Sequence, residues 1–220
     1  MNRIVVFANG ELKQPELLKA QLQAGDRIFC ADGGTRHALA LELTPEAIIG
    51  DLDSVDLEVI EHLRARGVRF EQHPPRKDET DLELALNAAL AEQPEEIMLV
   101  TALGGRLDQM LANVLLLTRP EYASVRLTLA DGATRALLIR AGQRVTVTGR
   151  PRDTLSLVPL TPEVTGVEFS GVEWPLRQAT LTLGSSRSIS NRLQGNQASL
   201  RIEAGLVLLV HLSEQLSEGD

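Results

Sequence analysis

The stretch Ile4-Val5-Val6-Phe7 is apolar at every position. A strand with one face in water would alternate apolar and polar side chains, whereas a continuous apolar run is typical of a strand that helices cover on both faces. Ile97-Met98-Leu99-Val100 has the same character further along the chain. These two stretches predict a parallel sheet buried between two layers of helices.

Short apolar segments alternate with segments of helical periodicity through the first part of the chain. This βαβα alternation predicts a doubly wound, mostly parallel α/β/α sheet. The predicted strands cover residues 3–9, 27–32, 47–49, 68–72, 97–101 and 125–130, and the predicted helices cover residues 17–22, 35–43, 56–66, 80–91 and 107–117.

The pattern changes after about residue 133, where short strand-like runs replace the helices. These runs cover residues 145–148, 155–158, 179–183, 199–202 and 206–212, and glycines such as Gly149, Gly166 and Gly184 lie between them. Closely spaced strands with glycine turns are typical of a small antiparallel sandwich or barrel. We therefore predict an α/β domain over residues 1–135 and a smaller antiparallel β-sandwich domain over residues 136–220.

The composition is that of an ordinary globular protein, with 43% hydrophobic and 24% charged residues among 220. A net charge of −8 argues against a nucleic-acid binder, which needs clustered Lys and Arg side chains to neutralise phosphates. No apolar run near the start is long enough for a signal peptide or a membrane span. We expect a cytoplasmic protein, in which the single cysteine, Cys30, is structural.

Acidic residues gather in the loops that follow the predicted strands. Ligands bind beyond the carboxyl ends of the strands in an open parallel sheet, and the segments 31–34 (Ala-Asp-Gly-Gly), 50–54 (Gly-Asp-Leu-Asp-Ser), 77–81 (Lys-Asp-Glu-Thr-Asp) and 104–108 (Gly-Gly-Arg-Leu-Asp) all lie there. Two carboxylates about 4 Å apart repel by roughly 4 kcal/mol at an effective dielectric near 20, so such a cluster needs a cation. Oxygen-only ligands favour Mg²⁺, and the four histidines have no zinc-ligand spacing.

Several of these residues also have a simpler explanation. Thr80 and Glu83 match a capping box at a helix start, and the glycine pairs could be tight turns. The Gly-Asp-x-Asp-Ser segment is the most specific signal, because a solvated turn has little need for two carboxylates so close together. Asp51 and Asp53 can share a metal only if the chain turns between them, and Ser54 could instead cap the next helix.

Taken together, the four segments resemble the thiamine pyrophosphokinase family, in the same order along the chain. Glu173-Trp174-Pro175-Leu176 and Ser188-Ile189-Ser190-Asn191 are similar to that family's signatures near the carboxyl terminus. The resemblance implies a catalytic, nucleotide-binding domain over residues 1–135 and a thiamine-binding and dimerisation domain over residues 136–220. It also implies a homodimer that transfers pyrophosphate from ATP to the hydroxyl of thiamine and releases AMP.

The resemblance also assigns individual residues. It implies that Asp51, Asp53 and Asp81 are the catalytic carboxylates that hold Mg²⁺. The implied ATP contacts are Asp32, Gly33, Gly34, Lys77, Asp78, Gly105, Arg106 and Asp108, and the implied thiamine contacts are Trp174, Ser188, Ser190 and Asn191. Two positions depart from the family pattern: Gln109 stands where a histidine is usual, and Arg192 where an acidic residue is common.

Other interpretations remain open from the sequence. Trp174 could be a core residue, and the serines around Ser190 could form a polar turn. The same metal chemistry would serve a pyrophosphokinase for another heterocyclic alcohol, such as a hydroxymethylpterin. A nucleotide- or thiamine-sensing module without turnover, or acidic helix caps without any ligand, would also fit parts of the pattern.

Overall fold

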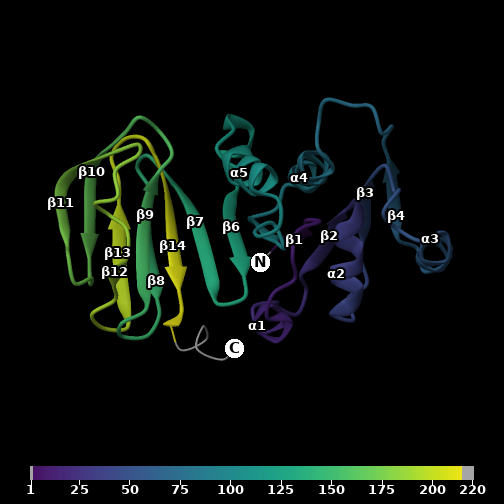
Figure 1. The fold of residues 1–220 in the computed structure, drawn as a ribbon, viewed down its shortest axis with the longest axis horizontal. Helices are drawn as coiled ribbons and strands as arrows, with labels where there is room; N and C mark the ends of the chain where they lie inside the picture. The colour runs from purple at the N-terminus through teal and green to yellow at the C-terminus, as the bar shows by residue number, and fades with distance from the viewer. Residues whose placement is uncertain (1, 215–220) are drawn as a thin grey trace. The chain divides into compact units, whose positions relative to one another are not determined.

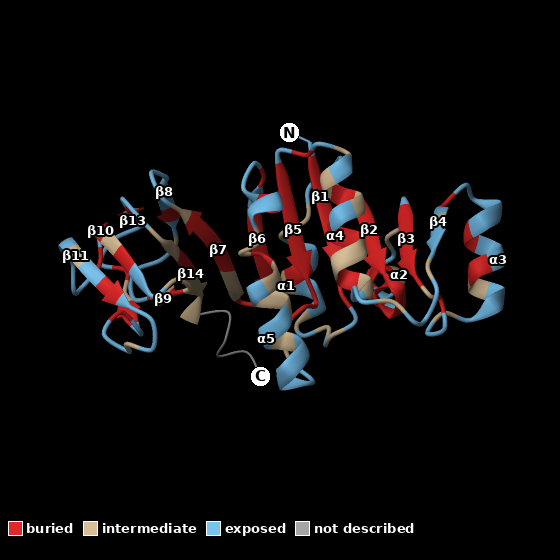
Figure 2. Ribbon diagram, turned by 90° about the horizontal axis from the view of Figure 1, so that it is seen from above, coloured by how far each residue is buried: buried red, intermediate tan, exposed pale blue. Residues whose placement is uncertain are grey.

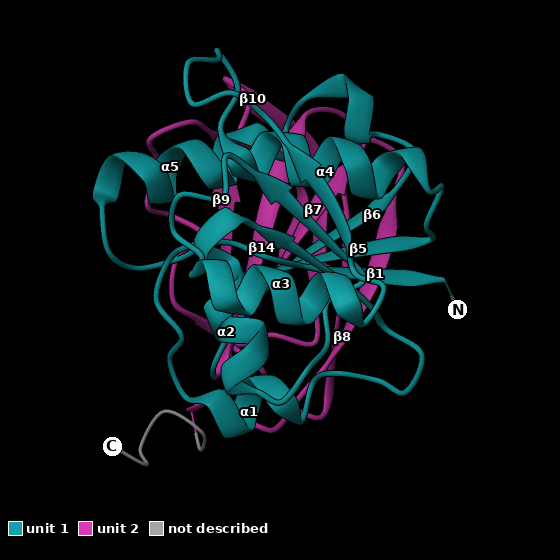
Figure 3. Ribbon diagram, turned by 90° about the vertical axis from the view of Figure 1, so that its right-hand side faces the viewer, with its two compact units in different colours: residues 1–132 teal, residues 133–220 magenta. Residues whose placement is uncertain are grey.

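The computed structural model describes residues 2–214, which form two compact units that meet in the sequence between Gly132 and Ala133 (Figure 3). The predicted division at residue 135 is three positions later, and the last predicted residues, 215–220, lie outside the described part of the chain. Each unit has its own hydrophobic core. None of the helices in residues 2–214 is long and apolar enough to span a membrane.

Unit 1 (residues 1–132) is built on a parallel sheet in the order β6-β5-β1-β2-β3-β4. The central strands are buried along their whole length (Figure 2), as the apolar runs predicted. The strands are β1 (Arg3–Phe7), β2 (Arg27–Ala31), β3 (Ala47–Gly50), β4 (Arg69–Gln72), β5 (Glu96–Val100) and β6 (Arg126–Asp131).

Helices cover both faces of this sheet, with α4 and α5 on one side and α1, α2 and α3 on the other (Figure 3). Alternate residues of β1 therefore face different helices: Val5 and Phe7 belong to the core that includes Ala38 of α2 and Leu63 of α3. The helices are α1 (Pro15–Lys19), α2 (Thr35–Ala40), α3 (Leu57–Ala65), α4 (Asp81–Ala91) and α5 (Leu107–Leu116), with 3₁₀ turns η1 (Asp32–Gly34) and η2 (Pro120–Tyr122). The doubly wound fold is confirmed.

Local sequence explains where α4 begins and why α5 differs from it. Thr80 caps α4, because its Oγ1 accepts a hydrogen bond from the Glu83 amide at 3.2 Å. In α5 the leucines at positions 107, 111 and 115 fall on one face and are 65%, 52% and 54% exposed. That face of α5 is apolar surface that unit 1 leaves uncovered.

Unit 2 (residues 133–220) is an antiparallel sandwich, as predicted (Figure 1). One sheet has the order β12-β9-β14-β7 and the other β11-β10-β13-β8, and side chains of both sheets meet in one core around Leu157, Phe169, Leu200 and Leu209. The strands are β7 (Thr134–Arg140), β8 (Arg144–Thr148), β9 (Thr154–Pro159), β10 (Glu163–Ser170), β11 (Leu176–Thr182), β12 (Asn191–Arg192), β13 (Gln197–Arg201) and β14 (Leu206–Leu212).

Three strands of unit 2 were not predicted, namely β7, β10 and the two-residue β12. β7 follows directly on the last strand of unit 1, and β10 contains Gly166, which we expected in a turn between strands. Gly166 has a φ of 63°, and the pairing of β10 with β11 shifts register between Val164 and Val167. The glycine therefore marks a β-bulge inside a strand.

Candidate functional site

The carboxyl ends of the unit 1 strands surround a cavity of about 320 Å³. Its lining comes from the residues after β1, β2, β3 and β5, from the β4–α4 loop, and from one face of α5. This is the edge at which an open parallel sheet binds its ligands. The predicted residues Asp32, Asp51, Lys77 and Asp81 all line the cavity.

The backbone after β3 turns sharply and brings two carboxylates to the same side. Leu52 has a φ of 65°, in the left-handed region that a leucine seldom adopts. The turn places the Asp53 amide 3.4 Å from Asp51 Oδ1, and Ser54 Oγ donates to Asp53 Oδ1 at 2.9 Å. The turn that joint metal binding requires is present, and Ser54 supports Asp53.

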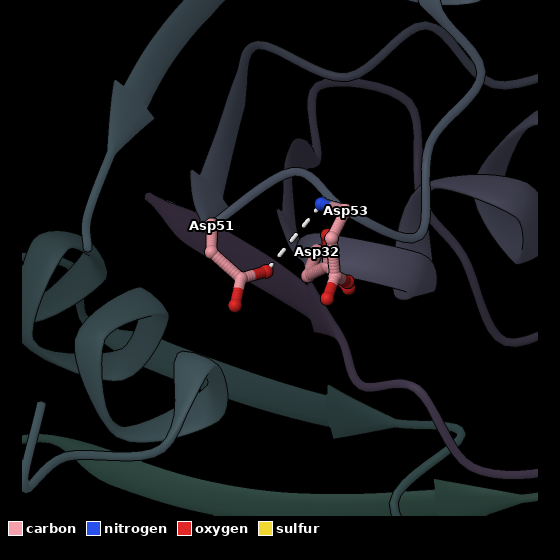
Figure 4. A group of neighbouring side chains, drawn as sticks. All are labelled: Asp32, Asp51 and Asp53. Atoms are coloured by element: carbon pink, nitrogen blue, oxygen red, sulfur yellow. Dashed lines mark hydrogen bonds between the residues drawn. The ribbon is translucent and has the colours of Figure 1, made fainter. Parts of the chain in front are cut away.

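Asp32, at the end of β2, joins Asp51 and Asp53 in a carboxylate cluster (Figure 4). One carboxylate oxygen from each residue lies within 4.8 Å of the other two. Asp32 is buried, has a φ of 41°, and its Oδ1 accepts no hydrogen bond from the described residues. A buried carboxylate oxygen without a partner is unfavourable, so the cluster is suited to a hard divalent cation such as Mg²⁺.

Asp81 lies at the start of α4, next to the carboxylate cluster, and forms an ion pair with Lys77. Its Oδ1 is 2.7 Å from Nζ of Lys77, whose side chain is 11% exposed. Burial lowers the pKa of Lys77, but the carboxylates of Asp81, Asp51 and Asp32 outweigh that effect and raise it. Lys77 therefore carries its charge into the cavity, where it can contact a phosphate.

Gly50 allows these groups to approach one another. A Cβ atom at this position would lie 2.9 Å from Asp32 Cβ and 3.0 Å from Asp81 Oδ1. Glycine is therefore required between the two acidic elements, both for space and for its φ of 150°.

The other predicted nucleotide contacts have mainly local partners. A Cβ on Gly33 would collide with the Asn9 side chain, and one on Gly34 with the Phe7 carbonyl, so both glycines serve close packing of η1 against the end of β1. The Gly105 amide donates to Glu11 Oε1 at 3.1 Å. Among the remaining predicted contacts, Arg106 and Asp108 form an exposed ion pair at 2.6 Å, and Asp78 is exposed.

Some lining residues were not named as candidate contacts from the sequence. Asn9 and Gly10 follow β1, and the rule that ligands bind after strands would have found them. Gln109, Met110 and Asn113 lie on the cavity face of α5. Gln109, a departure from the family pattern, thus lines the cavity.

Trp174 in unit 2 is exposed at 57% of its surface, so it is not a core residue. Asn191 holds its backbone at two points: Asn191 Oδ1 accepts from the Trp174 amide at 3.1 Å, and Asn191 Nδ2 donates to the Trp174 carbonyl at 2.8 Å. Ser188 is also buried, and its hydroxyl donates to the Leu157 carbonyl at 2.7 Å. Trp174, Ser188 and Asn191 line one hollow of about 280 Å³, which we call the Ser188 hollow.

Ser190 differs from these neighbours. It is exposed with a φ of 61°, and its amide donates to Ser156 Oγ at 2.9 Å. It is absent from the residues that line the Ser188 hollow. Its predicted contact with thiamine stays a prediction.

Comparisons with known proteins cover both units. A family model described as "Thiamin pyrophosphokinase, catalytic domain" matches residues 18–129, and one described as "Thiamin pyrophosphokinase, vitamin B1 binding domain" matches residues 143–207. A thiamine pyrophosphokinase of Bacillus subtilis is 26% identical over 183 residues, covering 83% of this chain and 86% of the relative.

Solved structures agree with these matches. The crystal structure of the Bacillus subtilis thiamine pyrophosphokinase superposes with a TM-score of 0.85 at 25% identity, covering 96% of this chain and 99% of that one. The thiamin pyrophosphokinase of Geobacillus thermodenitrificans gives a TM-score of 0.83 at 25% identity, over 96% of this chain and 98% of the other.

Proposed function

This chain belongs to the thiamin pyrophosphokinase family, and we propose that it transfers pyrophosphate from ATP to thiamine at the cavity of unit 1, using Asp51, Asp53 and Asp81 as the catalytic carboxylates. It is an ATP-dependent transferase, a thiamine diphosphokinase. The expectation drawn from the sequence motifs is confirmed at the level of family and reaction.

One observation supports the placement of the site more than any other. Asp32, Asp51 and Asp53 bring carboxylate oxygens within 4.8 Å of one another, and two of them, Asp32 and Asp51, line a cavity with Lys77 at the carboxyl ends of the strands. A polyphosphate is itself an anion, so a site of this charge accepts it only with a cation between the carboxylates and the phosphates. Acidic helix caps without a ligand would not explain a buried Asp32 oxygen that has no hydrogen-bond partner among residues 2–214.

The residues present fit magnesium. We infer that Asp51 and Asp53 hold it, with Asp32 as a third ligand from the carboxylate cluster and Asp81 beside them through its pair with Lys77. Bound there, the ion would stabilise negative charge on the transferred and leaving phosphates. A cluster made only of carboxylate oxygens favours Mg²⁺ over metals that prefer nitrogen or sulfur.

The protein's own groups then position the two substrates. The thiamine hydroxyl oxygen forms a bond to the β-phosphorus, the bond from that phosphorus to the α–β bridging oxygen breaks, and AMP departs with the electron pair while the hydroxyl proton is released. Lys77 would stabilise the charge on the phosphates. We propose nucleotide contacts also for Gly33, Gly34, Asp78, Gly105, Arg106 and Asp108, as the family resemblance implies.

For thiamine we propose the Ser188 hollow of unit 2. The exposed indole of Trp174 offers an aromatic face to the cationic thiazolium ring, and Asn191 fixes the Trp174 backbone. Because Ser188 and Asn191 already bond to backbone atoms, we propose that they act mainly by shaping this hollow. A thiamine contact from Ser190 is proposed on the family resemblance alone.

The decisive experiment measures AMP release from ATP and Mg²⁺ with thiamine or a hydroxymethylpterin as acceptor. We expect AMP only with thiamine. AMP formed with the pterin alone would support the other pyrophosphokinase, and nucleotide binding without any AMP would support a sensing module. Neither alternative is favoured by the family match.

We also propose a homodimer. The exposed leucines of α5 and the exposed Leu183 and Ile189 of unit 2 are apolar surface that a second copy would cover. Light scattering on the purified chain tests this, and a monomer at micromolar concentration would refute it. The cytoplasmic location remains a prediction, which cell fractionation checks.

A further inference from the structure

Trp174 also lines a second hollow of unit 2, which has a different chemical character. This hollow has a volume of about 520 Å³, and Arg152, Glu173 and Arg192 line it together with Trp174. We call it the arginine hollow. None of the predicted thiamine contacts except Trp174 belongs to it.

The walls of the arginine hollow are tied to one another by backbone hydrogen bonds. The Arg152 amide donates to the Leu193 carbonyl at 2.8 Å, and the Leu193 amide donates to the Asp153 carbonyl at 2.9 Å. On the other side, the Glu173 amide donates to the Arg192 carbonyl at 2.9 Å. These bonds therefore join the backbone segments that carry the lining residues of the hollow.

A buried carboxylate anchors the turn that carries Arg152. Asp153 is 2% exposed, its Oδ2 accepts a hydrogen bond from the Arg150 amide at 2.9 Å, and the same oxygen lies 2.8 Å from His211 Nε2 on β14. The hydrogen bonds from Arg150 and His211 outweigh burial and lower the pKa of Asp153. The turn is thereby fixed to the sheet beneath it.

The charge of the arginine hollow suits an anion. Within residues 2–214, neither Arg152 nor Arg192 has a carboxylate at ion-pair distance, and Arg192 Nη1 donates to the Arg152 carbonyl at 3.2 Å. Two arginines and one glutamate, Glu173, line the hollow, although the chain as a whole carries a charge of −8. Thiamine offers these arginines no phosphate, whereas the phosphate oxygens of a diphosphate match the guanidinium donors.

We propose that the arginine hollow binds a heteroaromatic diphosphate, with its ring against the Trp174 indole and its phosphates on Arg152 and Arg192. Planar rings stack on an exposed indole, and guanidinium groups bind phosphate oxygens through paired donors. Thiamine diphosphate is such a compound, and calling it the reaction product rests on the proposed function. The arginine hollow would then sense the product at a place distinct from the carboxylate cluster.

The test is a binding titration of the full chain without ATP or magnesium. Trp174 is the only tryptophan, so its fluorescence reports on both hollows that it lines, and the arginine variants show which of the two is occupied. Thiamine diphosphate, ADP, thiamine and inorganic pyrophosphate are titrated separately into the wild type, Arg152→Gln, Arg192→Gln and the control Arg144→Gln, which removes an exposed arginine on β8.

We expect at least one of the two diphosphates to bind the wild type about tenfold more tightly than thiamine or pyrophosphate does, and the tighter of the two identifies the ring. Arg152→Gln and Arg192→Gln should each weaken diphosphate binding about tenfold, while Arg144→Gln should not. Added salt should weaken diphosphate binding to the wild type more than thiamine binding, a readout that needs no variant to fold.

Three results would overturn the proposal. They are equal affinity for thiamine and both diphosphates, equal affinity for pyrophosphate and both diphosphates, or arginine variants that bind a diphosphate as the control does. Because no ATP or metal is present, a chain that releases no AMP could still bind the diphosphate, and an active enzyme could fail to bind it. Failure of the proposed function and failure of the arginine hollow are thus distinguishable.

Discussion

Replacing Gly50 by alanine would test whether the spacing of the acidic groups matters for turnover. An alanine Cβ would lie 2.9 Å from Asp32 Cβ and 3.0 Å from Asp81 Oδ1, whereas ordinary carbon contacts begin at 3.4 Å. Asp32 would therefore have to move by about 0.5 Å, and a shift of that size exceeds what a catalytic arrangement tolerates without loss. Gly50 also has a φ of 150°, which adds backbone strain of about 1–3 kcal/mol for alanine.

We expect Gly50→Ala to lower kcat/KM for AMP release by about ten- to a hundredfold, and to lower the free energy of unfolding by about 1–3 kcal/mol. Gly67→Ala is the matched control. Gly67 follows the end of α3 and has a φ of 82°, but an alanine Cβ at this position would have no atom within 4 Å. The control should lose about 1 kcal/mol of stability and keep wild-type kcat/KM.

Steady-state AMP release and urea unfolding of both variants supply the two measurements. A folded Gly50→Ala protein with wild-type kcat/KM would refute the reasoning, because the carboxylates would then work without the spacing seen in the structure. Equal losses of kcat/KM in the two variants would refute it as well, since backbone strain alone would explain them.

Four further predictions concern single side chains. Asp51→Asn should reduce AMP release by about a hundredfold while the thermal midpoint stays near that of the wild type, because the residue lies in a loop; near-normal rates would contradict its role. Lys77→Gln should weaken ATP binding about tenfold in a nucleotide titration with Mg²⁺, and unchanged affinity would exclude a phosphate contact. Trp174→Phe should raise KM for thiamine more than KM for ATP, whereas a lower melting temperature alone would indicate a packing role. Asp153→Asn should lower the free energy of unfolding by about 1.5–3 kcal/mol near pH 6. The folded pKa of Asp153 lies below its ordinary value, so this stabilisation is present above about pH 4 and is lost as the pH falls through the folded pKa. Urea unfolding at lower pH should therefore show a smaller difference in the free energy of unfolding between the wild type and Asp153→Asn.

The strands of unit 1 could be predicted because burial on both faces leaves a mark in the sequence. β1 and β5 are apolar at nearly every position, and each lies between two layers of helices. β7 was missed, although Ala136 to Ile139 are all apolar, because alanine and leucine are as common in helices as in strands. β10 was missed for another reason: a glycine inside a strand looks the same in sequence as a glycine in a turn.

The site could be predicted only in outline. Asp51 and Asp53 were found because they follow a buried strand, and the cavity lies at that edge. That Asp32 rather than Asp81 has an oxygen within 4.8 Å of both depends on positive φ angles at Asp32 and Leu52. Neither residue type favours that conformation strongly enough to be read from sequence, so tertiary packing decides it.

Backbone strain and repulsion between carboxylates occur at the same few residues of the site. The turn after β3 holds Leu52 in the left-handed region, and the carboxylate cluster brings together charges that repel one another. Neither feature helps the metal-free chain to fold, and the buried sheet and the capped start of α4 must offset both. Since any ion that binds the folded chain more tightly than the unfolded chain stabilises it, a divalent cation would relieve the repulsion that the fold maintains. The carboxylate cluster is thus arranged for its ligand at the expense of stability, which is the relation expected of a catalytic site.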